Sequence, residues 1–283
     1  IEIKDGGTGI FIKNDGSTLS SASNELELKY SGSNTGTGVG LYYEGRTGAN
    51  ITNGTNVKLV DIVGTNAGLV GLYTVGGVKL TNTARIAGDK GYGIITNGTE
   101  IINNGTVTLT SPLTSSKPSV GILTQSGDDI TNTGIISVGD NSVGIYSEGG
   151  NVDLDTTSQI NVGTDKAVGV FTKGNGQIVT ARSGSTMTIG DSSFGFLNEG
   201  TGNTINSNAA SQILGNDVTY IYSRDTTGAV NNNTALTSTG SYNYGLYSAG
   251  TVTNNADINF GTGVGNVGIY STYGGTATNM TGK

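Results

Sequence analysis

The stretch Val143-Gly144-Ile145-Tyr146-Ser147-Glu148-Gly149 shows most clearly the motif that decides the fold. An apolar residue is followed by glycine, two apolar residues and a polar tail that ends in glycine. We call this motif the cassette; it recurs along the whole chain at a mean spacing of about 26 residues. Its glycine position is occupied in turn by Gly9, Gly40, Gly71, Gly93, Gly121, Gly144, Gly169, Gly195, Tyr220, Gly245 and Gly268.

Two weaker apolar stretches separate each cassette from the next. After Gly149 they are Val152–Leu154 and Gln159–Val162, and other repeats show the same order. No segment carries apolar residues at helical spacing over a helical length. Each repeat is therefore expected to hold three short strands, with Gly and Asn at the corners supplying the positive φ values of tight turns.

Three strands and three corners in about 26 residues correspond to one coil of a β-helix. A single coil cannot bury its apolar face, but coils stacked about 4.8 Å apart can do so. The sequence thus predicts an all-β chain, a right-handed parallel β-helix of about eleven coils of three short strands. Because the composition is uniform, residues 1–283 are expected to form a single segment.

The composition narrows the possible functions. The chain has 49 glycines but only 2 prolines and no three-residue period, which excludes collagen. Its net charge is −7 and its Lys and Arg residues are scattered singly, so we expect no nucleic-acid partner. With no cysteine and no histidine, thiolate and imidazole ligands are absent, and we expect neither a metal site nor a cofactor.

Alternation along the cassette predicts which side chains face outward. One parity holds Val143, Ile145 and Ser147, and the other holds Gly144, Tyr146 and Glu148. Other copies place Lys, Arg or Glu at the last of these positions, and charged groups are rarely buried. The second parity is therefore expected to face solvent, with the glycines forming a groove beside the Tyr146 position.

The Tyr146 position is apolar in every copy, which predicts an external ladder along the rod. Large exposed apolar patches usually mark interaction surfaces. Mutual stacking of neighbouring rungs is the alternative, since cross-strand pairs stabilise sheets. The aromatic residues of this ladder that we single out as receptor-binding candidates are Tyr42, Tyr73, Tyr146, Phe171, Tyr222, Tyr247 and Tyr270.

The segment Ser111–Ser119 interrupts the cassette pattern and contains both prolines. Because proline cannot join a central ladder, this segment is expected to protrude as a loop. Pro112, Lys117 and Pro118 are therefore further receptor-binding candidates, although a plain insertion would look the same. The long early repeats, around 31–37 and 61–68, are expected to protrude similarly.

An enzyme is the main alternative, since several polysaccharide-cleaving enzymes are parallel β-helices. Acid–base chemistry needs two groups close to one bond. Asp128-Asp129 points to opposite faces of a strand, whereas Asp153 and Asp155 share a face at about 7 Å. Aspartate at a corner is more often a turn residue, so we expect no catalytic residues and no enzyme.

The cassette, with Ile-Thr-Asn-Thr-Gly and Asn-Asn-Gly-Thr between its copies, resembles the passenger of large fusobacterial outer-membrane autotransporter adhesins of the monomeric type. The resemblance is best at 40–45, 144–150, 169–174 and 245–250, and its style covers nearly the whole chain. It transfers no individual binding residue.

The resemblance implies a monomeric passenger on a Gram-negative cell surface that adheres to bacteria or host cells through a glycan or protein receptor. It also implies a signal sequence and a C-terminal membrane barrel outside these residues, which would be the only contact with the membrane.

Three functions are thus considered: an adhesive stalk, a polysaccharide-acting enzyme and an architectural spacer. An extended apolar stripe beside the proline-containing loop would favour the adhesin. Acids clustered with Arg or Lys on one exposed sheet would favour the enzyme, and a bare polar ladder would favour the spacer.

Overall fold

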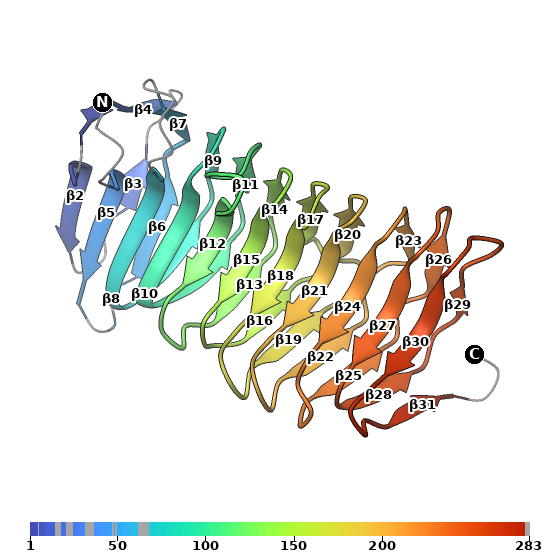
Figure 1. The fold of residues 1–283 in the computed structure, drawn as a ribbon. Coiled ribbons are helices and arrows are strands. Elements are labelled where there is room, and N and C mark those ends of the chain that lie inside the picture. The colour runs from blue at the N-terminus through green and yellow to red at the C-terminus, as the bar shows by residue number, and fades with distance from the viewer. Residues whose placement is uncertain are drawn as a thin grey trace.

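The chain is an all-β parallel solenoid. The computed structural model describes residues 1–4, 6–14, 18–20, 25–31, 37–46, 48, 50–61 and 68–280, and this part of the chain contains strands and no helix. Neighbouring coils pair in parallel, and the ribbon advances as a rod with the two termini at opposite ends (Figure 1). The predicted fold class is confirmed, with about ten turns between the first and the last cassette.

The cassettes form one sheet of the solenoid. In the ladder from β12 to β15, Ile122 lies opposite Ile145 and Leu123 opposite Tyr146, so equivalent positions stack in register. The strands that carry the cassettes are β2 (Thr8–Asn14), β5 (Val39–Gly45), β8 (Val70–Asn82), β10 (Tyr92–Asn103), β12 (Val120–Thr124), β15 (Val143–Ser147), β18 (Val168–Thr172), β21 (Phe194–Asn198), β24 (Thr219–Ser223), β27 (Tyr244–Ser248) and β30 (Val267–Ser271).

A second sheet follows the first around each coil. In two coils the first and second strands merge into the long strands β8 and β10, which bend at Gly76 and Gly98 with φ values of 95° and 77°. The prediction of three separate strands is therefore wrong for these two coils. The remaining strands of the second sheet are β3 (Thr18–Ser20), β6 (Asn50–Gly54), β13 (Ile130–Asn132), β16 (Val152–Leu154), β19 (Ile178–Ala181), β22 (Thr204–Ser207), β25 (Ala229–Asn232), β28 (Thr251–Asn254) and β31 (Ala277–Asn279).

A third sheet closes each coil. It runs continuously through eight strands and resumes as a shorter three-stranded sheet near the C-terminal end. Its strands are β1 (Glu2–Ile3), β4 (Leu26–Tyr30), β7 (Val57–Asp61), β9 (Arg85–Gly88), β11 (Thr106–Leu109), β14 (Ile135–Val138), β17 (Gln159–Val162), β20 (Thr186–Ile189), β23 (Gln212–Leu214), β26 (Leu236–Ser238) and β29 (Ile258–Asn259).

The hydrophobic core fills the inside of the rod along its length. Each sheet contributes side chains to it, for example Ile145 from the first, Val152 from the second and Ile160 from the third. Ile145 and Ile160 are fully buried, and Val152 nearly so. At the C-terminal end, Ile258 and Ile269 are only partly buried because no further coil covers them there.

Buried asparagines stack inside the corner that follows the second sheet. The side-chain amide of Asn82 donates to Asn103 at 2.8 Å, and that of Asn103 donates to Asn132 at 2.7 Å. A second run links Asn232 to Asn254 at 2.7 Å. The sequence predicted positive φ values for corner asparagines, but among the described residues only Asn141 has one, so for Asn that prediction is wrong.

The corner before each cassette uses the left-handed conformation instead. The residue three positions before the cassette glycine position has positive φ in six successive coils, from the 44° of Asn141 to the 71° of Gly265. The backbone N–H of this residue donates to a carbonyl of the next coil in most of these coils. The residues concerned are Asn141, Lys166, Ser192, Asp217, Tyr242 and Gly265.

Candidate functional site

The outward face of the cassette sheet differs from the predicted one at two positions. Gly144 points inward, because a Cβ placed on it would lie 2.6 Å from the carbonyl oxygen of Gly169 and 3.4 Å from the core side chain of Ile160. The ladder from β12 to β15 pairs Val120 with Val143 and then Ile122 with Ile145, leaving the glycines unpaired. The strand is locally irregular at the glycine, so the alternation of inward and outward side chains is interrupted and two successive residues, Gly144 and Ile145, both point inward.

Tyr220, which replaces glycine in one cassette, confirms this orientation. Its side chain is fully buried, packs edge-on against Phe196 with ring centroids 5.6 Å apart, and hydrogen-bonds to the Ser207 hydroxyl at 2.7 Å. The predicted orientation is correct from Ile145 to Glu148. It is wrong for Gly144 and Val143, and no external glycine groove runs beside the ladder.

The residue before the glycine therefore joins the Tyr146 position on the outside. Val120, Val143 and Val168 form a hydrophobic cluster separate from the core, against which Tyr146 and Phe171 pack. We call these two columns the outer stripe. Its members are Thr8, Val39, Val70, Tyr92, Val120, Val143, Val168, Phe194, Thr219, Tyr244 and Val267 in the first column, and Phe11, Tyr42, Tyr73, Ile95, Leu123, Tyr146, Phe171, Leu197, Tyr222, Tyr247 and Tyr270 in the second.

The predicted aromatic candidates fall into three groups separated by aliphatic rungs. The first contains Tyr42 and Tyr73, whose ring centroids lie 5.3 Å apart. The second pairs Tyr146 edge-on with Phe171 at 4.8 Å. In the third, Tyr247 stacks on Tyr222 at 4.5 Å and on Tyr270 at 4.9 Å. Each such aromatic pair stabilises the fold by about 0.5–1.5 kcal/mol beyond the contribution of the apolar area that it buries.

Stacking places ring faces of these residues against one another. The side chain of Tyr270 is 42% exposed at the last rung, whereas Tyr146 is half-buried. Burial raises the pKa values of Tyr42, Tyr146 and Tyr247 above their usual value of 10.0. Their hydroxyls therefore stay protonated at neutral pH and present a row of hydrogen-bond donors and acceptors.

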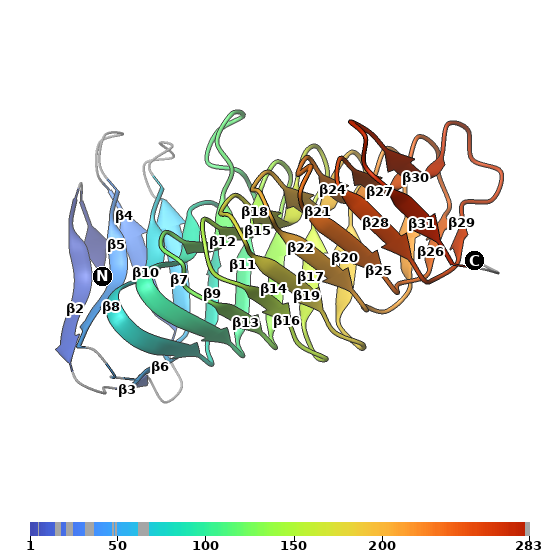
Figure 2. The same cartoon turned by 90° about the horizontal axis from the view of Figure 1, so that it is seen from below.

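The proline-containing segment forms the predicted loop, which projects between β11 and β12 (Figure 2, green). Thr114 and Lys117 form an isolated antiparallel bridge at its tip, where Lys117 is exposed and Pro112 and Pro118 are half-buried. Leu113 is buried at the base of the loop. The residues within 32–36 and 62–67, where two further loops were predicted, lie outside the described part of the chain.

The loop lies beside the outer stripe. A Cβ placed on Gly68 would meet both the ring of Tyr92, a stripe member, at 2.9 Å and the side chain of Leu113 at 3.4 Å. The structure thus places Leu113 of the loop close to the stripe at one coil. It does not gather all ten candidates, because the groups of Tyr73, Tyr146 and Tyr247 lie on different coils.

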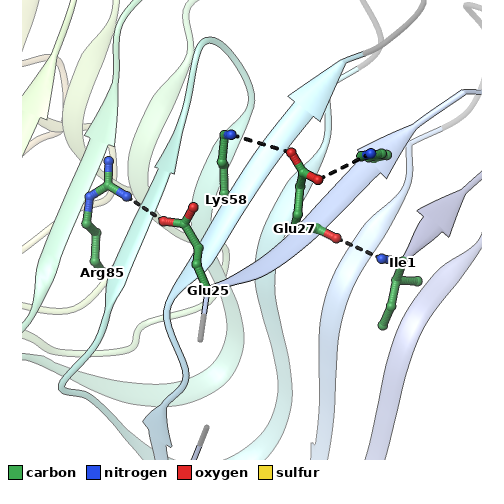
Figure 3. Close-up of polar contacts among 6 residues, drawn as sticks. Ile1, Glu25, Glu27, Lys58 and Arg85 are labelled. Carbon is green, nitrogen blue, oxygen red and sulfur yellow. Dashed lines mark hydrogen bonds and ion pairs between the residues drawn. The ribbon is translucent and has the colours of Figure 1, made fainter. Parts of the chain in front are cut away.

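Charged side chains form ion pairs between coils on the outside of the third sheet (Figure 3). Arg85 binds Glu25 at 2.6 Å, and Glu27 lies 3.4 Å from Lys58 and 3.3 Å from Lys29. The hydrogen bond from Lys29 lowers the pKa of Glu27. Lys58 and Glu27 join neighbouring strands of the sheet, Arg85 and Glu25 lie two strands apart, and Lys29 and Glu27 lie within one strand.

The acidic pairs considered for catalysis are also bound to other groups. Arg182 binds both carboxylate oxygens of Asp153, with Nε and Nη2 distances of 2.7–3.0 Å. Asp128 accepts a hydrogen bond from the Gly98 N–H at 2.8 Å, and Asp129 accepts one from the Asn151 N–H at 2.7 Å. These carboxylates cross-link coils.

Sequence reasoning missed a groove on the outer face of the third sheet. It has a volume of about 550 Å³ and crosses β7, β9 and β11. We call it the sheet groove; it is lined by Glu25, Lys58, Leu59, Val60, Asp61, Arg85, Ala87, Gly88, Asp89, Lys90, Thr108 and Thr110. The signal in the sequence was the small pair Ala87-Gly88 in the shortest repeat.

The buried asparagines were also missed, although their signal was present. Asn103 and Asn132 each follow an apolar residue by two positions and precede a glycine by two. The apolar residue recurs in the same place before Asn82, Asn232 and Asn254, where Ala or Thr stands in place of the glycine. Because Asn103 and Asn132 are fully buried, they act as structural residues and not as ligand-binding ones.

Comparisons of the chain with protein-family models, curated proteins and solved structures gave no significant match. Among the described residues, no three His, Cys, Asp or Glu side chains are arranged to hold a metal ion. The described residues also include no helix of the length and apolarity that a membrane-spanning helix requires.

Proposed function

We propose that this chain is a stalk segment of a cell-surface adhesin, displayed as an autotransporter passenger, that contacts a glycan or protein receptor. The observation that carries the proposal is the outer stripe, an apolar strip that runs past eleven cassettes with the proline-containing loop beside it. The second column of the stripe is partly exposed on most coils, whereas Val70, Val120, Val143 and Val168 of the first column are only 2–6% exposed. Extended apolar surfaces that reach solvent often mark interaction sites. A rigid solenoid presents such a surface at a fixed distance from its anchor.

The chemistry of the stripe suits recognition of another surface. Tyrosine combines a large apolar ring with a hydroxyl, and it is enriched where proteins bind partners. Stacking fixes the rings of Tyr222, Tyr247 and Tyr270 before any partner arrives, so little side-chain entropy remains to be lost on binding.

An architectural spacer is the second candidate function, and one observation favours it. The rings of Tyr42 and Tyr247 each stack on the rings of both neighbouring rungs. The aromatic residues of the stripe therefore pack against one another without a partner. In that case a receptor would contact another part of the parent protein.

Catalysis has less support, although acids and cations do share exposed sheets. A carboxylic acid that donates a proton at neutral pH needs a raised pKa. Hydrogen bonds instead lower the pKa values of Glu27, Asp89, Asp140 and Asp191.

The test is binding of the purified chain to a glycan array, to whole bacteria and to host cells. Tyr146→Ala and Tyr247→Ala are expected to reduce binding at least tenfold, and so is Lys117→Ala if the loop participates. Ile213→Ala is the matched control, because Ile213 is 67% exposed on another sheet. Absence of binding by the intact chain would refute the adhesin and leave the spacer.

A further inference from the structure

The sheet groove is a hollow on the outer face of the third sheet. Its floor is apolar and consists of Leu59, Val60, Ala87 and Gly88. Leu59 and Ala87 are largely buried, so the floor is fixed by the fold. A volume of about 550 Å³ is in the range of small-molecule sites.

The groove exists because one coil is shorter than its neighbours. Gly71 and Gly93 are separated by fewer residues than any other two successive cassette positions. The short corner after β9 is followed one coil later by the proline-containing loop, whose first residue, Ser111, donates from its hydroxyl to Asp89 at 2.6 Å. The loop is thereby held at one side of the groove.

The groove is extended along the strand direction. Arg85, the first residue of β9, lines one end of it, and Lys90, two residues beyond the last residue of β9, lines the other. The four residues of the strand alone span about 13 Å. That length accommodates a short oligosaccharide lying across the rod. The hydroxyls of Thr108 and Thr110 line the same side and offer hydrogen bonds to sugar hydroxyls.

The charges of the groove are unevenly satisfied. Three cationic and three acidic residues line it, but Glu25 is bound by Arg85 at 2.6 Å and Asp89 accepts hydrogen bonds from the Thr110 and Ser111 hydroxyls. Lys90 forms no ion pair with another described residue and is half-buried beside the floor. Asp89 beside it remains anionic, and Lys90 contributes to the lowering of the Asp89 pKa after the hydrogen bonds from Ser111 and Thr110. Lys90 is thus a lining cation without an ion pair to another described residue, and its ammonium group can contact an anionic group.

We infer that the sheet groove binds a short oligosaccharide that carries a carboxylate, with Lys90 contacting the carboxylate and Thr108 contacting sugar hydroxyls. This inference rests on the proposed function and names a ligand class for it. Sialic acids and uronic acids share this chemistry.

The test is calorimetric titration of the purified chain with soluble sugars. The probes are 3′-sialyllactose, a hyaluronan tetrasaccharide that carries glucuronate, and lactose as the neutral counterpart of the first. At least one acidic sugar is expected to bind tenfold or more tightly than lactose. Binding by only one of them identifies the sugar, and binding by neither at 10 mM overturns the inference, as does equal binding of lactose.

Two variants with matched controls locate the site. Thr108→Trp fills the groove and is expected to abolish binding, whereas Thr188→Trp, in the same outward column three coils further along, leaves it unchanged. Lys90→Ala is expected to weaken binding at least tenfold, and Lys173→Ala is not. Unchanged thermal unfolding shows that the variants fold, and a Lys90→Ala affinity equal to that of the parent refutes the role of Lys90.

This titration separates the inference from the function on which it rests. Cell binding without binding of acidic sugars leaves the adhesin proposal standing and overturns the sugar site. Binding of acidic sugars without cell binding would support the sugar site and overturn the adhesin proposal.

Discussion

Ile145 and Tyr146 are neighbours in the chain but lie in different surroundings. Ile145 is fully buried among core side chains, whereas Tyr146 packs in the outer stripe and is half-buried. Truncating a fully buried aliphatic residue leaves a cavity as well as losing burial. The two positions therefore contribute differently to stability and to binding.

We expect Ile145→Ala to lower the free energy of unfolding by about 2–5 kcal/mol, and Tyr146→Ala to lower it by about half as much or less. Urea denaturation followed by circular dichroism measures both. A larger loss of unfolding free energy for Tyr146→Ala than for Ile145→Ala would mean that Tyr146, and not Ile145, faces the core.

Asn232 and Asn233 form a second informative pair. Both belong to amide ladders between coils, but Asn232 is buried and donates to Asn254 at 2.7 Å, whereas Asn233 is exposed and donates to Asn208 at 2.7 Å. Asn232→Ala should lower the free energy of unfolding by about 1–3 kcal/mol, since it leaves a buried polar group without its partner. Asn233→Ala should change it by no more than about 0.5 kcal/mol. Equal losses would show that burial of the ladder has no effect.

At this scale the sequence predicted the two columns of the cassette but not the change of phase at glycine. Alternation alone places Gly144 outside, because it takes no account of the next coil's backbone. The local irregularity depends on the carbonyl oxygen of Gly169 and the side chain of Ile160, which belong to other repeats or strands. Tyr220 carried the missing information, since its inward ring shows which way that position points.

Among the elements, the corners distinguish one coil from another. The strands repeat with little change, whereas the corner before the cassette ranges from the short turn after β9 to the proline-containing loop after β11. Proline content predicted the loop correctly. The sheet groove was not predictable from any one repeat, because it arises from a short corner next to a long one.

Aspartates tie these corners together and make them sensitive to acid. The Thr164 hydroxyl and N–H both donate to Asp140 at 2.8 Å, and the N–H of Asn216 donates to Asp191 at 2.8 Å. These bonds lower both pKa values below the ordinary 3.8. The stabilisation is therefore present above pH 3.8 and is lost as the pH falls through the lower pKa of the folded state.

We expect the urea midpoint of the parent chain to fall more steeply below pH 4 than that of an Asp140→Asn, Asp191→Asn double variant. Denaturation at pH 7, 4 and 3 checks this. Parallel pH profiles for the two proteins would contradict the assigned role of the carboxylates.

At the scale of the whole molecule, strand pairing joins each coil of the described chain to the coils on either side. Stability of such a rod is close to a sum of nearest-neighbour contributions. The first and last coils of the described chain have one neighbour each, and their core residues Ile10 and Ile269 are only partly buried. The repeat period was enough to predict this architecture.

Hydrogen exchange should therefore be slowest in the central coils, around β15 and β18, and fastest in β30 and β31. Mass spectrometry of peptides from each coil measures the gradient. Uniform protection along the rod would indicate a single cooperative unit instead of neighbour-by-neighbour stability.

The in-register pairing of successive cassettes has a consequence for how such a molecule changes in evolution. Val143 lies opposite Val168, and Ile145 lies opposite Val170, so duplicating or deleting one whole repeat restores the same contacts at the new junction. Such an event alters the reach of the rod by about 4.8 Å and leaves its cross-section intact. Recombination between repeats can thus tune length independently of surface chemistry.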